Sequence, residues 1–167
     1  LMCMTRMSDV VAETPEGQSV GVVKNMSVMC EISLSSFSKV IMNTIEEFII
    51  PLVETDVYEI NKVHTSKVLI NGNWMGYTHS PTDLLSCFKE KRRSGVINIY
   101  ASISWNTVEN TIYIYSDEGR CVRPLFYIEN GSMNICHYID HIRKNGVEWK
   151  ELLSDIILDK CCIEYLD

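Results

Sequence analysis

The chain has 167 residues, of which 46% are hydrophobic and 22% are charged, a composition typical of a globular protein that buries a core. Its formal net charge of −7 argues against a free-standing protein that coats nucleic acid through bulk electrostatics. The sequence has no run of about 18 apolar residues that would span a membrane, and its first residues lack the features of a signal peptide. We expect the seven cysteines to be reduced thiols, and no Cys-x-x-Cys pair supports structural zinc.

A polar stretch over residues 13–21, Glu-Thr-Pro-Glu-Gly-Gln-Ser-Val-Gly, predicts a stiffened loop. Pro15 fixes its own φ, and Gly17 and Gly21 allow positive φ or close approach of another chain. The loop therefore presents Glu16 and the neighbouring Gln18 on a constrained backbone.

Lys24 and Asn25 follow this loop and could contact a backbone phosphate or hold the loop through hydrogen bonds. A single lysine in a polar loop is more often solvated. The segment is not a P-loop, because that motif needs four residues between its glycines and a lysine directly after the second.

The next elements are a helix and a hairpin. Apolar spacing predicts a helix over residues 36–50, capped by Ser36 or Ser38 and ended by Pro51. After a polar connector over 53–65, strands over 68–70 and 74–77 flank Asn71-Gly72, the strongest short signal for a type I′ turn.

The remaining pattern predicts one long helix, three strands and two short helices. The long helix begins at Pro81 and ends in the basic run 89–93, before Gly95. Strands are expected over 97–105, 111–115 and 122–129, the last an edge strand or a bulge because it contains Pro124. Helical patterns follow over 134–144 and 148–160, so the fold class is mixed α+β.

Three segments, in chain order, resemble the second-largest subunit of multisubunit DNA-dependent RNA polymerases. Residues 13–25 resemble the end of its fork region, and residues 67–76 resemble the Asn-Gly-x-Trp-x-Gly hairpin of its first external domain. Residues 117–129 resemble its Asp-Ala-Gly-Arg-x-x-Arg-Pro-Leu-Phe-x-Val-Glu segment, and residues 149–167 more weakly resemble the opening of its second external domain. Because the chain starts at Leu1 and ends without a polar tail, we expect an internal fragment.

The resemblance implies three parts: the end of the fork region over 1–35, a small external domain with β-hairpins and helices over 36–121, and the beginning of a second external domain over 122–167. It implies that the whole enzyme is a nucleotidyltransferase that synthesises RNA on DNA. Its partners would be the largest subunit and other polymerase subunits, the DNA template and the RNA–DNA hybrid, with no membrane. Its Mg²⁺ would be bound mainly by another subunit, so we expect no metal, no catalytic residue and no activity in the fragment alone.

The family's usual Trp-Gly and Cys-Pro residues before the loop are replaced here by residues 7–11. This divergence suits a eukaryotic-type polymerase, for example that of a large DNA virus. The resemblance implies an intracellular protein, in the nucleus or, if it is viral, in a viral factory or virion.

The resemblance also assigns roles to single residues. Glu16 and Gln18 would lie near the active centre, although Glu16 could instead accept hydrogen bonds from its own loop. Lys24 would contact nucleic acid. Structural roles fall to Pro15, Gly17, Gly21, Asn71, Gly72, Gly119, Arg120 and Arg123, with both arginines expected to form ion pairs or hydrogen bonds that fix their hairpin.

Three further groups have a functional and a structural interpretation. The basic run 89–93 could bind nucleic acid, but a solvated helix end is favoured. Cys136, His137 and His141 are interpreted as packed residues rather than metal ligands, and Trp74 and Trp105 as core aromatics. The competing hypothesis for the whole chain is a non-enzymatic α/β module that binds a protein partner through the hairpin region.

Overall fold

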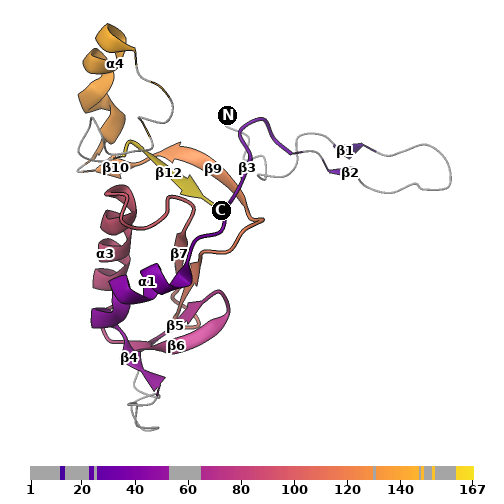
Figure 1. The fold of residues 1–167 in the computed structure, drawn as a ribbon, viewed down its shortest axis with the longest axis vertical. Coiled ribbons are helices and arrows are strands. Elements are labelled where there is room, and N and C mark those ends of the chain that lie inside the picture. The colour runs from indigo at the N-terminus through magenta and orange to yellow at the C-terminus, as the bar shows by residue number, and fades with distance from the viewer. Residues whose placement is uncertain are drawn as a thin grey trace, which may run out of the picture.

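The computed structural model describes residues 12–13, 23–24, 26–52, 65–129, 131–146, 148, 152 and 161–167. Within these residues the fold is mixed α+β, as predicted (Figure 1). A five-stranded sheet with two helices forms the lower part in that view, and a three-stranded sheet lies above it.

The five-stranded sheet has the order β4-β6-β5-β8-β7. Its strands are β4 Ile50–Pro51, β5 Ser66–Ile70, β6 Asn73–Thr78, β7 Ser102–Asn106 and β8 Thr111–Tyr115. All neighbours are antiparallel except β5 and β8, which are parallel. The predicted turn joins β5 to β6, with φ of 49° at Asn71 and 81° at Gly72, the positive values that this turn type requires.

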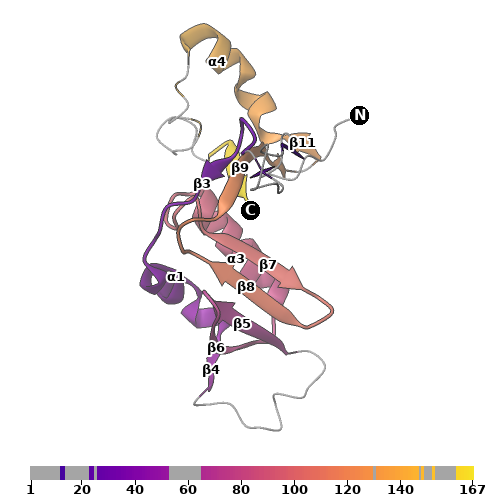
Figure 2. The same ribbon diagram turned by 90° about the vertical axis from the view of Figure 1, so that its right-hand side faces the viewer.

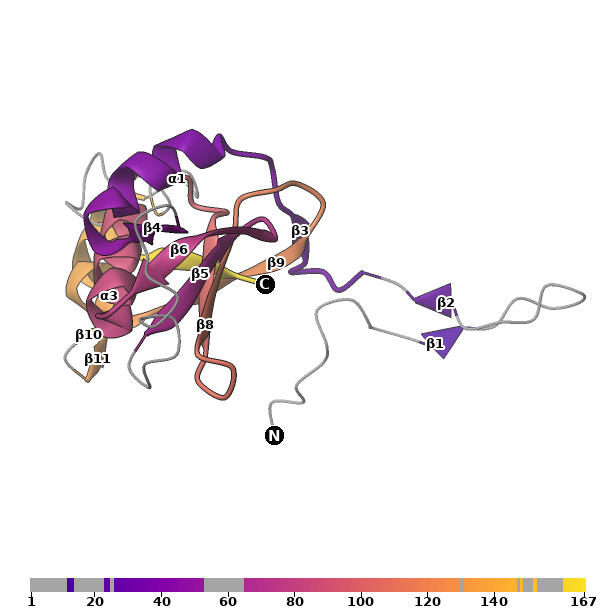
Figure 3. The same cartoon turned by 90° about the horizontal axis from the view of Figure 1, so that it is seen from below.

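Two helices, α1 (Ser38–Ile45) and α3 (Pro81–Arg93), cover one face of this sheet (Figures 2 and 3). A short 3₁₀ helix, η1 (Glu46–Phe48), continues α1. The core between helices and sheet is formed by apolar side chains that are at most 3% exposed: Ile41, Ile45, Val68, Ile70, Leu84, Phe88, Ile97, Ala101, Ile112 and Ile114. Alternate residues of β8 enter this core, as period-2 patterning of a half-buried strand predicts.

The three-stranded sheet joins segments from both halves of the sequence. Its order is β12-β9-β3, with β3 at Glu31–Ile32, β9 at Cys121–Phe126 and β12 at Ile163–Leu166. Both outer strands are antiparallel to β9. Pro124 was predicted to lie in an edge strand, but β9 is the central strand of this sheet. β3 pairs only with residues 121–122, so at Pro124 the described partner is β12 alone, and the strand has a free edge there as proline requires.

Smaller elements complete the described fold. They are β1 Ala12–Glu13, β2 Val23–Lys24, β10 Ile128–Glu129, β11 Ser132–Met133, the 3₁₀ helix η3 Asn134–Tyr138 and α4 Ile139–Asn145. Figures 1 and 3 show β1 and β2 standing away from both sheets, beyond β3. Of the described helices, none is long and apolar enough to cross a membrane.

Several predicted boundaries were wrong. The helix expected over 36–50 is shorter, its N-cap residue is Phe37 without a side-chain cap, and Pro51 lies in a strand rather than after a helix. The strand expected over 97–105 begins only at Ser102, because residues 91–101 instead turn the chain through backbone hydrogen bonds such as Ala101 N–H to Asn98 O. The connector over 53–64 and most of the helix expected over 148–160 lie outside the described residues.

Candidate functional site

The loop that carries most of the predicted site lies outside the described residues. Pro15, Glu16, Gly17, Gln18 and Gly21 all belong to this part of the chain. The structure does describe the strands that precede and follow the loop, β1 and β2, which pair antiparallel. The backbone of Lys24 lies opposite Ala12 in that pair.

Arg120, which lies between β8 and β9, is the centre of a group of contacts. Its Nε is 2.9 Å from Oδ1 of Asp117, and its guanidinium also forms an ion pair with Asp167. The same group donates to the Ser102 hydroxyl at 3.1 Å and to the Tyr100 carbonyl at 2.8 Å. The side chain is 16% exposed. A planar guanidinium can make these contacts at once because its donors are fixed in a fork.

Ser33 connects this arginine to the segment that follows the loop. The backbone N–H of Ser33 donates to the Arg120 carbonyl at 2.8 Å, and the Ser33 hydroxyl accepts from the Arg120 N–H at 3.0 Å. The hydroxyl also donates to the Asp117 carbonyl at 3.2 Å, and the Ser33 carbonyl accepts from Gly119 at 3.1 Å. Gly119 has φ of 82°, the left-handed region that favours glycine. Ser33 is 1% exposed, and its N–H, carbonyl and hydroxyl groups all form hydrogen bonds.

The segment that follows the loop also contacts Tyr100, which precedes β7. The Tyr100 hydroxyl donates to Glu31 at 2.7 Å, and its ring lies 4.9 Å from that of Tyr165 on β12. Burial raises the pKa of Tyr100 to about 12, and the nearby Glu31 carboxylate adds to this effect by disfavouring the phenolate. The tyrosine therefore stays a hydrogen-bond donor across the physiological pH range.

The other predicted structural residues that are described, Asn71 and Arg123, differ in their hydrogen bonds. Asn71 does more than form the turn, because its amide donates to the Ser116 hydroxyl at 3.0 Å and its Oδ1 accepts from Ser116 N–H at 2.8 Å. Arg123 differs from Arg120: its Nε is buried and has no hydrogen-bond partner among the described residues. Its cross-strand neighbour on β12 is the apolar Leu166, which offers no acceptor side chain.

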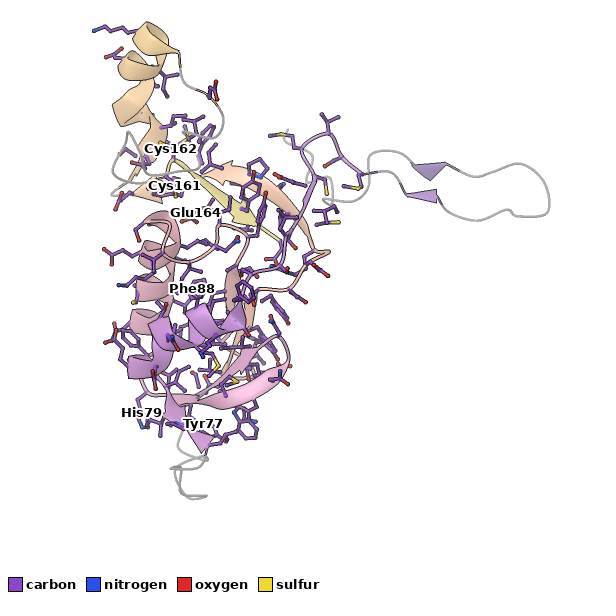
Figure 4. The ribbon with its side chains drawn as sticks, viewed as in Figure 1. Tyr77, His79, Phe88, Cys161, Cys162 and Glu164 are labelled. Carbon is purple, nitrogen blue, oxygen red and sulfur yellow. The ribbon has the colours of Figure 1, made fainter. Side chains whose placement is uncertain are left out.

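The solvated interpretation of the basic run was wrong for its last two arginines. Arg92 is 6% exposed and donates to the Ala101 carbonyl at 2.9 Å and to Glu164 at 3.1 Å. Arg93 forms an ion pair with the same carboxylate, and its guanidinium lies 3.9 Å from the centre of the Tyr127 ring. Figure 4 shows Glu164 at the upper end of α3, with Cys161 and Cys162 above it. The acceptor comes from a segment about 70 residues away, so no local pattern could reveal it.

The core interpretation of Trp74 was also wrong. Trp74 is 41% exposed and lies on the sheet, with the Lys67 ammonium 5.4 Å from its ring centre. Its ring meets the ring of Tyr77 edge-on, and it is Tyr77 that is buried. Trp105 is partly buried against the core.

Metal binding finds no support in the part of the chain that the structure describes, where no three His, Cys, Asp or Glu side chains gather as ligands. Cys136 is exposed, and the side chains of His137 and His141 are not among those described. Sequence reasoning missed Ser33, Tyr100, Glu164 and Asp167, the partners of the arginines. No local sequence pattern could identify these four residues, because their contacts with the arginines join segments that are distant in the sequence.

Two family models match the chain. The model of RNA polymerase Rpb2, domain 3, matches residues 10–32, and that of RNA polymerase Rpb2, domain 4, matches residues 68–129. The first match contains the predicted loop and ends at β3, and the second contains the hairpin turn and Arg120.

Similar proteins come from fungi, microsporidia and archaea. DNA-directed RNA polymerase II subunit RPB2 of Meyerozyma guilliermondii is 37% identical over 71% of the chain and 10% of the relative. The subunit of the same name from Encephalitozoon cuniculi is 32% identical over 93% of the chain and 13% of the relative. DNA-directed RNA polymerase subunit Rpo2 of Saccharolobus solfataricus is 28% identical over 93% of the chain and 14% of the relative. The chain thus spans only 10% to 14% of the length of these relatives.

Proposed function

Because the chain belongs to the family of second-largest subunits of DNA-directed RNA polymerases, we propose that it is part of a subunit that synthesises RNA on a DNA template. The observation that carries this proposal is the order of the two family matches along one chain, the fork-type segment first and the hairpin-type domain second. In the reaction of the whole enzyme, the RNA 3′-hydroxyl attacks the α-phosphate of a nucleoside triphosphate and pyrophosphate leaves.

The loop over 13–21 is proposed to lie close to the active centre. Glu16 and Gln18 would shape the entry of the nucleotide or position basic side chains of neighbouring elements, and Lys24 would contact a backbone phosphate. None of these residues is a group that reacts. Their effect on rate would come from positioning, which can contribute several kcal/mol to a barrier.

The proposed division of labour within the enzyme follows from the family resemblance. Two Mg²⁺ ions, proposed to be bound mainly by the largest subunit, would activate the attacking oxygen and stabilise the leaving one. Among the described residues no three His, Cys, Asp or Glu side chains gather as ligands, and no step is assigned to a metal held by this chain. The largest subunit, other polymerase subunits, the DNA template and the RNA–DNA hybrid are the proposed partners, in the nucleus or in a viral factory or virion.

The proposed parts of the chain are the end of the fork region over 1–35, a first external domain over 36–121 and the start of a second over 122–167. The five-stranded sheet and its two helices fall within the middle part. The pairing of β3 with Cys121 and Val122 would then join the first part to the other two, whereas the pairing of β9 with β12 lies within the third part.

The test is elongation by a polymerase assembled with the full subunit that carries this chain. We expect Glu16→Ala to slow extension of an RNA primer about tenfold through mispositioning of the nucleotide. Glu118→Ala, in an exposed turn of the same chain, is the matched control and should leave elongation unchanged. Unchanged elongation in Glu16→Ala would refute the role of that residue, and an assembled wild-type enzyme that makes no RNA would refute the proposed function.

The alternative is a non-enzymatic module that binds a protein partner through the hairpin region. The exposed Trp74 and Lys67 are the side chains that such a surface would use, although the family matches do not favour this alternative. If that were the function, Trp74→Ala would abolish partner capture and Glu16→Ala would have no effect on any activity of the assembly.

A further inference from the structure

Two cysteines from distant parts of the sequence lie next to each other at one end of the pairing between β3 and β9. Cys30 directly precedes β3, and Cys121 is the first residue of β9. Ile32 lies opposite Cys121 in this antiparallel pair, so Cys30 stands two residues along from the paired position. Because alternate residues of a strand point to the same side, the two cysteines are diagonal neighbours on one face.

The two thiols are in contact. The Cys30 thiol shares a hydrogen bond with the thiol of Cys121. Its Sγ also lies 3.9 Å from the carbonyl oxygen of Glu31. Burial raises the pKa of the Cys30 thiol, and the neighbouring Cys121 adds to this effect through the hydrogen bond and through its charge. The Cys30 thiol is therefore largely protonated at neutral pH, and the pair rests in the reduced form.

The pair is also within reach of solutes. Cys30 and Cys121 are both partly exposed, unlike the two buried cysteines near the end of the chain. Cys87 and Cys136 are accessible as well, but they lie on other elements, α3 and η3. The contact at β3 and β9 therefore combines two features that oxidation of a thiol pair requires, which are proximity and access.

We propose that Cys30 and Cys121 form a reversible oxidation site, which a low-molecular-weight disulfide such as oxidised glutathione converts into an intramolecular disulfide bond. This inference is independent of the proposed function, because it involves neither nucleotide nor catalysis. The product would join the segment before β3 covalently to β9.

The reaction proceeds by two thiol–disulfide exchanges. One cysteine, as the thiolate, attacks oxidised glutathione, so that a mixed disulfide forms and one glutathione leaves as a thiolate. The other cysteine attacks the protein sulfur of the mixed disulfide and releases the second glutathione. The two protein thiols thereby give up two electrons and two protons, and one molecule of glutathione disulfide becomes two thiols.

The backbone must move only slightly to close this bond. Diagonal neighbours on paired strands lie about 7 to 8 Å apart, and a disulfide needs its two Cα atoms within about 7 Å. Cys30 lies just outside the strand, in the short turn that its N–H closes with the Ser27 carbonyl at 3.0 Å. β3 pairs with β9 through two residues only, so this segment can make the approach without breaking a long ladder.

The test uses the polymerase assembled with the full subunit that carries this chain. The assembly is equilibrated in glutathione buffers of increasing oxidised fraction, its free thiols are alkylated, and its peptides are mapped by mass spectrometry. We expect the peptide linked through Cys30 and Cys121 to exceed either cysteine's mixed disulfide with glutathione about tenfold, because the second thiol is held next to the first. Excess reduced glutathione should remove the link.

Two variants separate a paired site from two independent thiols. Cys121→Ser should abolish the linked peptide and leave Cys30 as the mixed disulfide with glutathione. Cys136→Ser is the matched control, because it removes an exposed thiol outside the pair and should leave the linked peptide unchanged. Separate mixed disulfides at Cys30 and Cys121 in the wild type, links to other cysteines, or no oxidation of either residue would each overturn the proposal.

Amide hydrogen exchange tests what the bond does to the fold. Oxidation should slow exchange over residues 26–32 about threefold in the wild type, because the segment is then fastened to β9. The same treatment of Cys30→Ser should leave this exchange unchanged. A linked peptide without slower exchange would overturn the fastening of the segment. The result does not depend on RNA synthesis, so a failure of the proposed function is distinguished from a failure of the oxidation site.

Discussion

At the scale of single residues, the Glu164 carboxylate joins two arginines of one helix to a strand from the end of the chain. Its two oxygens receive Arg92 and Arg93 from the end of α3, and the side chains of Glu164 and Arg92 are 10% and 7% exposed. In such a place, removal of one partner leaves an uncompensated charge out of water. The pair therefore joins β12 to α3 far more firmly than an exposed salt bridge would.

We expect Glu164→Gln to lower the free energy of unfolding by about 3 kcal/mol, because both arginines lose their countercharge in a poorly hydrated site. Denaturation in urea measures the change. Glu109→Gln, which weakens one exposed hydrogen bond with Tyr113, is the control and should cost under about 1 kcal/mol. Equal losses in the two variants would contradict the importance of burial.

What the sequence reveals about single residues depends on how local their partners are. Asn71-Gly72 was predicted correctly because a two-residue turn is encoded by the two residues themselves. Arg92 was misread as solvated because its acceptors, Ala101 and Glu164, include a residue from the far end of the chain. The positive charge near a helix end was visible in the sequence, and the carboxylate that meets it was not.

At the scale of elements, the contact between β4 and β6 depends on one glycine. Gly76 lies opposite Pro51, and a Cβ added to it would stand 2.2 Å from the Ile50 carbonyl oxygen and 2.7 Å from Cγ2 of Ile49. The neighbouring register also shifts between Val68 and Leu69, so that Met75 is the extra residue of a bulge. The second glycine of the Asn-Gly-x-Trp-x-Gly pattern thus serves strand packing, not the turn.

We expect Gly76→Ala to lower the unfolding free energy by about 3 kcal/mol, since the backbone of β4 must move to admit the methyl group. Gly131→Ala is the matched control: its Cβ meets open space, and only the φ of 82° opposes it, for about 1 kcal/mol. Thermal or urea unfolding gives both values. A loss in Gly76→Ala no greater than that of the control would contradict the close approach.

Helices and strands were predicted correctly where the pattern of their own side chains determines their conformation. β8 was predicted with its observed bounds because Thr111–Tyr115 alternates between core and surface. β12 was not predicted as a strand, because its four residues gain a partner only when residues 123–126 arrive beside them. Pro124 led to the prediction that β9 is an edge strand or a bulge, and its pairing with β3 was not foreseen because β3 comes from the opening of the chain.

At the scale of the whole molecule, buried thiols and phenols make folding sensitive to alkaline pH. Burial raises the pKa of Cys161 from 9.0 to about 11, and the Glu164 carboxylate adds to the shift. Between these two values the unfolded chain has lost the proton while the folded chain keeps it. The free energy of unfolding must therefore fall as pH rises through this window.

We expect the urea midpoint to be lower at pH 10.5 than at pH 8.5, and the decline to be shallower in Cys161→Ala. The exposed Cys136 supplies the control, since Cys136→Ala should keep the full decline. Tyr100, with a pKa of about 12, extends the loss to higher pH in all three proteins. An identical decline in wild type and Cys161→Ala would contradict the assignment to that thiol.

The arrangement of β3, β9 and β12 also determines how the molecule bears mechanical load. β3 and β12 lie on opposite edges of β9 and are both antiparallel to it, so they run in the same direction. Glu31 lies opposite Val122 and Leu166 lies opposite Arg123, so Glu31 and Asp167 lie at nearly the same level on the two edges of β9. Tension applied at these two residues would therefore act across β9, along the interstrand hydrogen bonds. Because these hydrogen bonds run perpendicular to the strands, they would be loaded along their own direction and would break one after another rather than together in shear. The five strands of the other sheet do not pair with β3, β9 or β12 among the described residues, so that sheet would be loaded only after these three strands separate.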